Sequence, residues 1–92
     1  MREFQKRKSV MRGIVEQEYI YARSRLYDRL GDGNRAYVDA LCVLVGGEYA
    51  AALRDFVTTD KGAVRICMEH AVSKSQLYRI VTKYYDAFDL TQ

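Results

Sequence analysis

The stretch that decides the fold is residues 63–81, which read Ala-Val-Arg-Ile-Cys-Met-Glu-His-Ala-Val-Ser-Lys-Ser-Gln-Leu-Tyr-Arg-Ile-Val. Two helices that cross closely over a short turn need small residues where they touch and where the chain turns. Cys67 and Ala71 stand at these two points, and Val72 follows the turn as an apolar plug. Ser73 is placed to cap the second helix, since a serine oxygen accepts a hydrogen bond from the first helical amides.

The apolar residues of this stretch follow helical spacing. Ile66 faces inward from the first helix, and Leu77 and Ile80, with Val81 beside them, face inward from the second. We expect a positive φ at Ala71, which costs an alanine on the order of 1 kcal/mol. We expect His70, at the end of the first helix, to hydrogen-bond a backbone carbonyl.

Residues 66–81 resemble the helix-turn-helix of bacterial transcription regulators, in which a small-residue turn, Val-Ser, and a second helix with Lys-Ser and Leu-Tyr-Arg recur. Similar cores occur in sporulation regulators, phage late-gene activators, sigma-factor-like regions and repressors of the tetracycline-resistance family. The resemblance covers about a fifth of the chain and is specific to the motif, not to one family. Two positions depart from the pattern: Ala71 replaces the usual glycine, and His70 replaces a usual apolar residue.

The resemblance implies a sequence-specific, double-stranded-DNA-binding transcription regulator of a phage or bacterium, whose second helix enters the major groove by its N-terminal end. With Leu77 inward, Arg79 points outward and is the expected base reader, because its guanidinium matches guanine O6 and N7. The other expected DNA contacts are Ser75 and Gln76 at base edges, Tyr78 at a thymine methyl or phosphate, Ser73 at phosphate, and Lys61, Arg65, Lys74 and Lys83 along the backbone. For Lys61, Arg65 and Lys83 an ordinary solvated side chain is an equally open reading.

Apolar residues at helical spacing continue upstream of the motif. Ser9 is expected to cap a helix of about 20 residues that ends at Gly31-Asp32-Gly33. Its apolar stripe is Met11, Val15, Tyr19, Ala22, Leu26 and Leu30. Asn34 is expected to cap a second helix with the apolar face Tyr37, Val38, Leu41, Cys42, Leu44 and Val45, which Gly46-Gly47 interrupts before a third with Tyr49, Ala52, Leu53, Phe56 and Val57. The sequence therefore predicts an all-α protein of about five helices, with the helix-turn-helix at its C-terminal end.

The predicted organisation is one helical domain over residues 1–92. Residues 1–8 form a basic, frayed N-terminal arm, residues 9–58 a helical dimerisation or partner region, and residues 60–88 the DNA-binding unit. A homodimer is expected, because one short helix contacts few bases and a second half-site multiplies specificity. RNA polymerase is a further candidate partner.

Charge and composition agree with this organisation. Residues 1–12 carry five basic side chains and one acidic one, residues 13–60 carry five and eight, and residues 61–92 carry five and three. Basic ends suit a polyanion, although an ordinary solvated surface is an equal reading. No apolar run long enough to span a bilayer and no secretory signal is evident, so we expect a cytoplasmic, nucleoid-associated protein.

Cofactor and enzyme functions are not expected. Cys42 and Cys67 lie in apolar helical patterns and are interpreted as small hydrophobic residues, and with one histidine they make no zinc site. No nucleophile, metal or phosphate-loop pattern is present, which argues against an enzyme. Two alternatives remain: a phage DNA-packaging, recombination or sigma-factor-like polymerase-binding protein, and a helical protein-interaction module without DNA binding.

Overall fold

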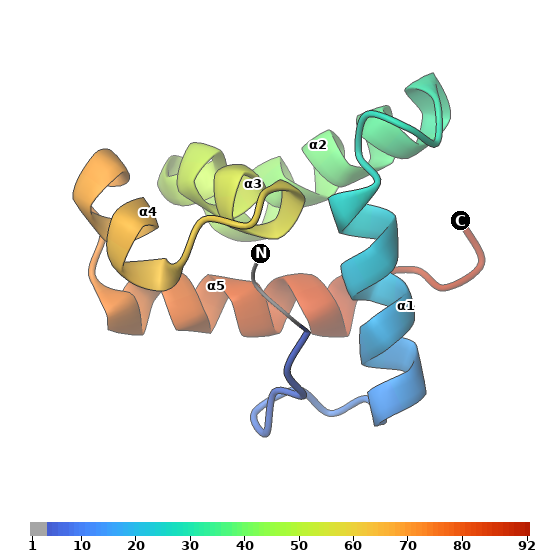
Figure 1. Cartoon of the computed structure of the whole chain (residues 1–92), viewed down its shortest axis with the longest axis horizontal. Helices are drawn as coiled ribbons and strands as arrows, with labels where there is room; N and C mark the ends of the chain where they lie inside the picture. The colour runs from blue at the N-terminus through green and yellow to red at the C-terminus, as the bar shows by residue number, and fades with distance from the viewer. Residues whose placement is uncertain (1–3) are drawn as a thin grey trace.

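The structure, a computed structural model, describes residues 4–92 and is all-helical, with no strand in that range. The all-α prediction is therefore confirmed. The elements are α1 (Ile14–Arg25), α2 (Asp32–Gly46), the short 3-10 helix η1 (Gly47–Tyr49), α3 (Ala50–Thr58), α4 (Ala63–His70) and α5 (Lys74–Ala87), as Figure 1 shows.

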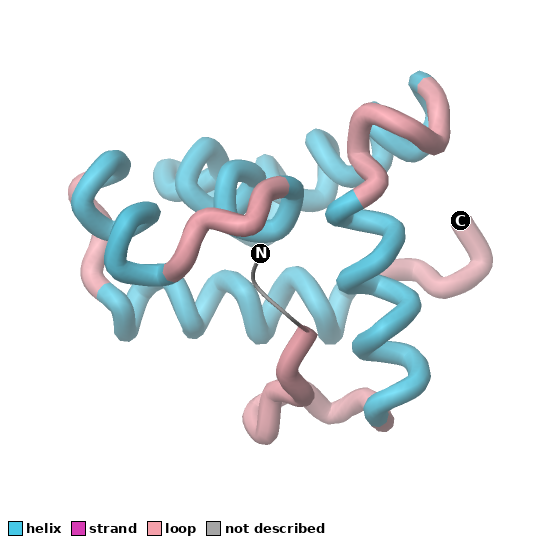
Figure 2. Tube along the Cα trace, viewed as in Figure 1, coloured by secondary structure: helices cyan, strands magenta, loops and turns pink. Residues whose placement is uncertain are grey.

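The helices surround α5, which is the long helix at the base of the molecule in Figure 1. α2, α3 and α4 all contact α5, and α2 also packs on α3. α4 lies at the N-terminal end of α5, while α1 crosses near its C-terminal end (Figures 1 and 2). The core between these helices contains the fully buried Ile20, Val38, Leu53, Ile66, Leu77, Val81, Tyr84 and Phe88.

The chain reverses direction at Gly46-Gly47, between α2 and α3. Gly47 has φ 54°, a left-handed conformation that glycine adopts without steric cost. Gly46 is buried against α3, where an added Cβ would make an ordinary van der Waals contact with Leu53 Cδ2 at 3.4 Å. The predicted break is confirmed, and Leu53 and Phe56 on α3 are buried as expected.

This helical pair is also the described stretch with enough length and hydropathy to suggest a membrane span, Asp32–Thr58. The stretch is folded back on itself at Gly47, and α2 packs against α3 along the hairpin. Core helices of this kind satisfy the same length and composition test, so the stretch is only weak evidence for a membrane span.

The prediction for the first helix is wrong in its bounds and its buried face. α1 has 12 residues with Gly13 as its N-cap, whereas Ser9 hydrogen-bonds Thr82 of α5 through its hydroxyl, at 2.8 Å. Its buried residues are Gln17, Ile20 and Ser24. The predicted stripe faces solvent: Met11 is 90% and Val15 76% exposed, and Tyr19, Ala22, Leu26 and Leu30 are exposed too.

The start of the second helix also differs from the prediction. α2 begins at Asp32 with Gly31 as N-cap, and Gly31 has φ 92°. Asn34 is buried inside the helix, where its Oδ1 accepts a hydrogen bond from Arg23 Nε at 2.7 Å. Asn34 therefore links α2 to α1 by hydrogen bonds and does not cap α2. Leu44 was expected on the buried face but is 77% exposed.

Residues 4–13, here called the N-terminal segment, are packed on the helices, which corrects the prediction of a frayed arm for its residues 4–8. The Arg7 amide donates to Gln17 Oε1 at 2.8 Å, and Gln17 Nε2 donates to the carbonyls of Arg7 and Arg12. Val10 is buried in the core. Arg2, part of the predicted basic arm, lies outside the described residues.

Candidate nucleic-acid interface

Three residues, Ala71, Val72 and Ser73, connect α4 to α5. Ala71 has φ 54° and ψ 46°, so the positive φ predicted for this turn is confirmed. The Val72 amide then donates to the Cys67 carbonyl at 3.2 Å, which closes the end of α4. Val72 is buried, as are the other predicted inward residues Ile66, Leu77, Ile80 and Val81. The connection is therefore short and held by its own apolar contacts.

Ser73 caps α5, as predicted. Its side-chain oxygen accepts from the Gln76 amide at 3.1 Å, and Gln76 Oε1 accepts from the Ser73 amide at 3.1 Å, which makes a reciprocal capping box. Gln76 Nε2 also donates to the Tyr49 hydroxyl at 2.9 Å. Gln76 is thus tied into the fold and does not point freely outward. The first helical amides, of Lys74 and Ser75, remain available for an outside acceptor.

The outer face of α5 carries the predicted readers. Ser75, Arg79 and Lys83, spaced by four residues, are exposed, and so is Lys74. Tyr78, beside them, is 42% exposed. Within residues 4–92, no carboxylate forms an ion pair with Lys74, Arg79 or Lys83. The first acidic residue of α5 is Asp86, near its C-terminal end, so the outer face is cationic along its first three turns.

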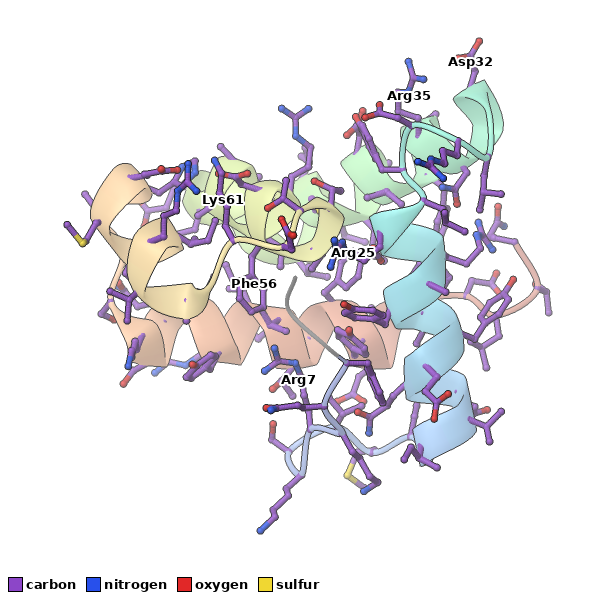
Figure 3. The ribbon with its side chains drawn as sticks, viewed as in Figure 1. Arg7, Arg25, Asp32, Arg35, Phe56 and Lys61 are labelled. Atoms are coloured by element: carbon purple, nitrogen blue, oxygen red, sulfur yellow. The ribbon has the colours of Figure 1, made fainter. Side chains whose placement is uncertain are left out.

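Lys61 and Arg65 are placed differently from the residues on α5. Lys61 Nζ lies 2.9 Å from both Asp55 Oδ2 and Glu69 Oε1, and Arg65 Nε lies 2.9 Å from Glu69 Oε2. Figure 3 shows Lys61 between α3 and α4. The carboxylates offset both cations, so these two residues add little positive charge to the surface.

His70 joins the same cluster, and its predicted hydrogen bond to a carbonyl is wrong. Its Nε2 lies 2.9 Å from Asp55 Oδ2, which links the end of α4 to α3. Asp55, Glu69 and His70 have potential metal-ligand atoms within 4.8 Å of one another. The ammonium of Lys61 already bonds both carboxylates at that place, so the cluster is an ion-pair network between α3 and α4.

Reasoning from the sequence missed the N-terminal segment as a neighbour of this interface. The Arg7 guanidinium lies over the rings of Phe56, Tyr78 and Tyr85, at 5.3, 5.7 and 6.0 Å from their centroids. Figure 3 shows Arg7 extending from this segment toward α5, and Phe56 between α3 and α5. The Met11 amide donates to Asp86 Oδ1 at 3.0 Å. The segment therefore lies along the flank of α5 that runs from Tyr78 to Asp86, leaves Tyr78 42% exposed, and leaves the Ser75–Arg79–Lys83 row open.

The cysteines lie away from this face. Both are free; Cys42 is buried, and Cys67 is partly buried and packed against the core. Burial, followed by the charge of Asp39, raises the pKa of the Cys42 thiol to about 12, so the thiol stays protonated at neutral pH. Both residues pack as small apolar groups, as predicted.

Comparison with known proteins identifies no relative. No protein-family model, curated protein or solved structure matches this chain.

Proposed function

We propose that this protein binds double-stranded DNA in a sequence-specific way through α4 and α5, as a helix-turn-helix whose second helix enters the major groove, and that it regulates transcription. The observation that carries the proposal is the open, cationic row on α5, next to a short turn with a left-handed Ala71. In this arrangement α4 crosses the DNA backbone and α5 presents its N-terminal half to base edges.

Two features of α5 support the entry of its N-terminal end into a groove. The amides of Lys74 and Ser75, which donate no hydrogen bond within residues 4–92, favour a phosphate oxygen together with the positive end of the helix dipole. The exposed Arg79 lies one helical turn further, within reach of base edges, and Lys83 lies one more turn along, where the phosphate backbone passes.

The structure changes the proposed roles of several predicted contact residues. Arg79 and Ser75 read bases, Lys74 and Lys83 bind phosphate, and Tyr78 contacts a thymine methyl or phosphate beside them. Gln76 and Ser73 hold the start of α5 in place. Lys61 and Arg65 orient α4 through Asp55 and Glu69 instead of binding DNA.

The proposal is tested by selecting a binding site from random duplex DNA and measuring affinity at two or more salt concentrations. We expect Arg79→Ala to lose about 1–3 kcal/mol of discrimination at one base pair. Lys83→Ala should weaken binding to all sequences and lower the slope of log affinity against log salt by about 0.9.

Arg54→Ala is the matched control, because Arg54 is an exposed arginine on α3 that forms a surface ion pair with Asp39. This variant removes the same charge from another face and should keep the selected sequence and its affinity. An Arg79→Ala variant with unchanged consensus and affinity would show that α5 does not read DNA. Absence of binding at low salt would favour the helical interaction module.

A further inference from the structure

The exposed face of α1 is apolar, although α1 also has a buried face on its opposite side. Met11, Val15 and Tyr19 are 90%, 76% and 40% exposed, and Leu26 is 37% exposed. Val15, Tyr19, Ala22 and Leu26 follow steps of three and four residues, so they form one stripe on the surface of α1, and Met11 precedes the helix in the N-terminal segment. We call Met11, Val15, Tyr19, Ala22 and Leu26 the α1 stripe. A row of apolar side chains turned to water is the pattern of a contact surface.

The charges beside the α1 stripe show what kind of helix fits it. At 100° per residue, Glu16 and Arg23 lie on one flank of the stripe, and Glu18 and Arg25 lie on the other. On each flank the acidic residue is in the N-terminal half of α1 and the arginine in the C-terminal half. None of these four residues forms an ion pair with any residue from 4 to 92. The two arginines do donate hydrogen bonds to neutral groups: Arg23 to Asn34, Tyr19 and the Gln92 carbonyl, and Arg25 to the Tyr21 hydroxyl.

This pattern is complementary to itself in an antiparallel arrangement. A two-fold axis that pairs two copies of α1 in opposite directions brings the same flank of each copy together. Glu16 of one copy then lies near Arg23 of the second copy, and Glu18 lies near Arg25, each within about half a helical turn. The same axis places Val15 close to Leu26 and packs the two Tyr19 side chains near the centre.

We infer that the α1 stripe is the interface of a homodimer in which two copies of α1 pack antiparallel. A helix of 12 residues is about 18 Å long, so the contact lies at the low end of protein interfaces, below about 1,200 Å² in total. The dimer is therefore reversible and depends on protein concentration. The inference does not require DNA binding, and its test uses no DNA.

Pairing through α1 also determines where the α4–α5 units lie in the dimer. α1 lies at the end of the molecule away from the α4–α5 turn (Figure 1). Pairing through α1 leaves both α4–α5 units on the outside, with the Ser75–Arg79–Lys83 row of each copy uncovered. DNA binding and dimer formation thus use different faces and can be disrupted separately.

The first test is sedimentation equilibrium of the intact chain over a range of concentrations up to ~1 mM. We expect a monomer–dimer equilibrium, and Val15→Glu should raise its dissociation constant by roughly a hundredfold, because it places a carboxylate in an apolar contact. Leu44→Glu is the matched control, since Leu44 is 77% exposed on α2, outside the stripe. It should leave the dissociation constant unchanged. Far-UV circular dichroism checks that both variants keep their helices.

The second test examines the antiparallel direction through charge. Glu18→Arg alone should weaken the dimer by roughly tenfold, because it sets two arginines against each other twice in each dimer. Combining it with Arg25→Glu restores opposite charges across the interface and should recover most of the affinity. High salt should reduce both effects.

Three results would overturn the α1 interface, and a fourth would overturn its antiparallel direction. The first is a monomer throughout the concentration range. The second is a dimer that Val15→Glu and Leu44→Glu weaken equally. The third is a monomer that binds phosphatidylglycerol vesicles and loses this binding in Val15→Glu, which would assign the face to a membrane surface. A dimer broken by Val15→Glu but not rescued by the charge exchange would contradict the antiparallel pairing.

Discussion

Ala71 has a strained backbone conformation in the turn between α4 and α5, and the proposed mode of DNA binding depends on that turn. It is the one non-glycine residue with positive φ among residues 4–92. The left-handed conformation brings Cβ close to the following carbonyl, which costs an L-residue roughly 1–2 kcal/mol. The turn retains this conformation because Val72 and Leu77, on either side of the α5 cap, are both buried. The angle between α4 and α5 therefore depends on packing that outweighs the strain at a single residue.

We predict that Ala71→Gly stabilises the protein by about 1 kcal/mol, because glycine adopts positive φ without the Cβ clash. Urea unfolding at constant pH measures the change. Ala40→Gly is the control: Ala40 is exposed in the middle of α2, and its replacement should destabilise by about 1 kcal/mol. Equal destabilisation by both substitutions would mean that the strain at Ala71 is not released by glycine.

At the scale of elements, ion pairs of Asp55 and Glu69 stabilise the contact between α3 and α4. Hydrogen bonds from Arg65 and Lys61 lower the pKa of Glu69 below its ordinary value of 4.5. Burial raises the pKa of Asp55, but hydrogen bonds from His70 and Lys61 outweigh it and bring the pKa below 3.8. A carboxyl with a depressed pKa in the folded state stabilises the fold above its unfolded pKa. That contribution is lost as the pH falls through the folded pKa.

We predict that this stabilisation is complete at neutral pH and is lost progressively below about pH 4.5. Comparing urea unfolding of the wild type with Asp55→Asn/Glu69→Gln at about pH 7 and about pH 3 tests it. At about pH 7 the wild type should be more stable than the double variant, and this difference in the free energy of unfolding should shrink at about pH 3. Glu48→Gln, at an exposed position of η1 without an ion pair within residues 4–92, serves as control and should show no such trend. A difference that is constant with pH would contradict the role of these ion pairs.

At the scale of the whole molecule, α1 and α5 are joined by a buried hydrogen bond between distant residues. The hydroxyls of Ser24 and Tyr84 lie 2.6 Å apart, and both side chains are almost fully buried. Burial, partly offset by the bond to Ser24, raises the pKa of Tyr84 far above its usual range, so the phenol is neutral. Arg12, just before α1, forms a second link to the C-terminal end of α5, because its guanidinium donates to the carbonyls of Asp86 and Phe88. The N-terminal segment, α1 and α5 thus share one core.

We predict that the chain unfolds in one cooperative transition, because no helix has a core of its own. Midpoints from far-UV circular dichroism and tyrosine fluorescence should coincide. Tyr84→Phe should lower the free energy of unfolding by about 0.5–1.5 kcal/mol through loss of the Ser24 bond. Tyr78→Phe, at an exposed site on the same helix, should change it by less than about 0.5 kcal/mol. Separate midpoints for the two probes would show that α1 and α5 unfold independently.

The sequence alone determined the features that depend on neighbouring residues. The cap at Ser73, the positive φ at Ala71 and the inward positions of Leu77 and Ile80 follow from helix spacing and turn chemistry within about ten residues. The outward direction of Ser75, Arg79 and Lys83 follows from the same spacing. The tie between Gln76 and Tyr49 was not predictable in this way, because its partner lies 27 residues upstream.

Tertiary structure alone decided which face of α1 enters the core. The helix has apolar residues on two sides, and spacing favoured the longer stripe from Met11 to Leu30. The structure buries Gln17, Ile20 and Ser24 instead, because the polar groups of Gln17 and Ser24 find hydrogen-bond partners in Arg7, Arg12 and Tyr84. A buried polar group is tolerated only when it is paired, and pairing across up to 60 residues exists only once the chain has folded.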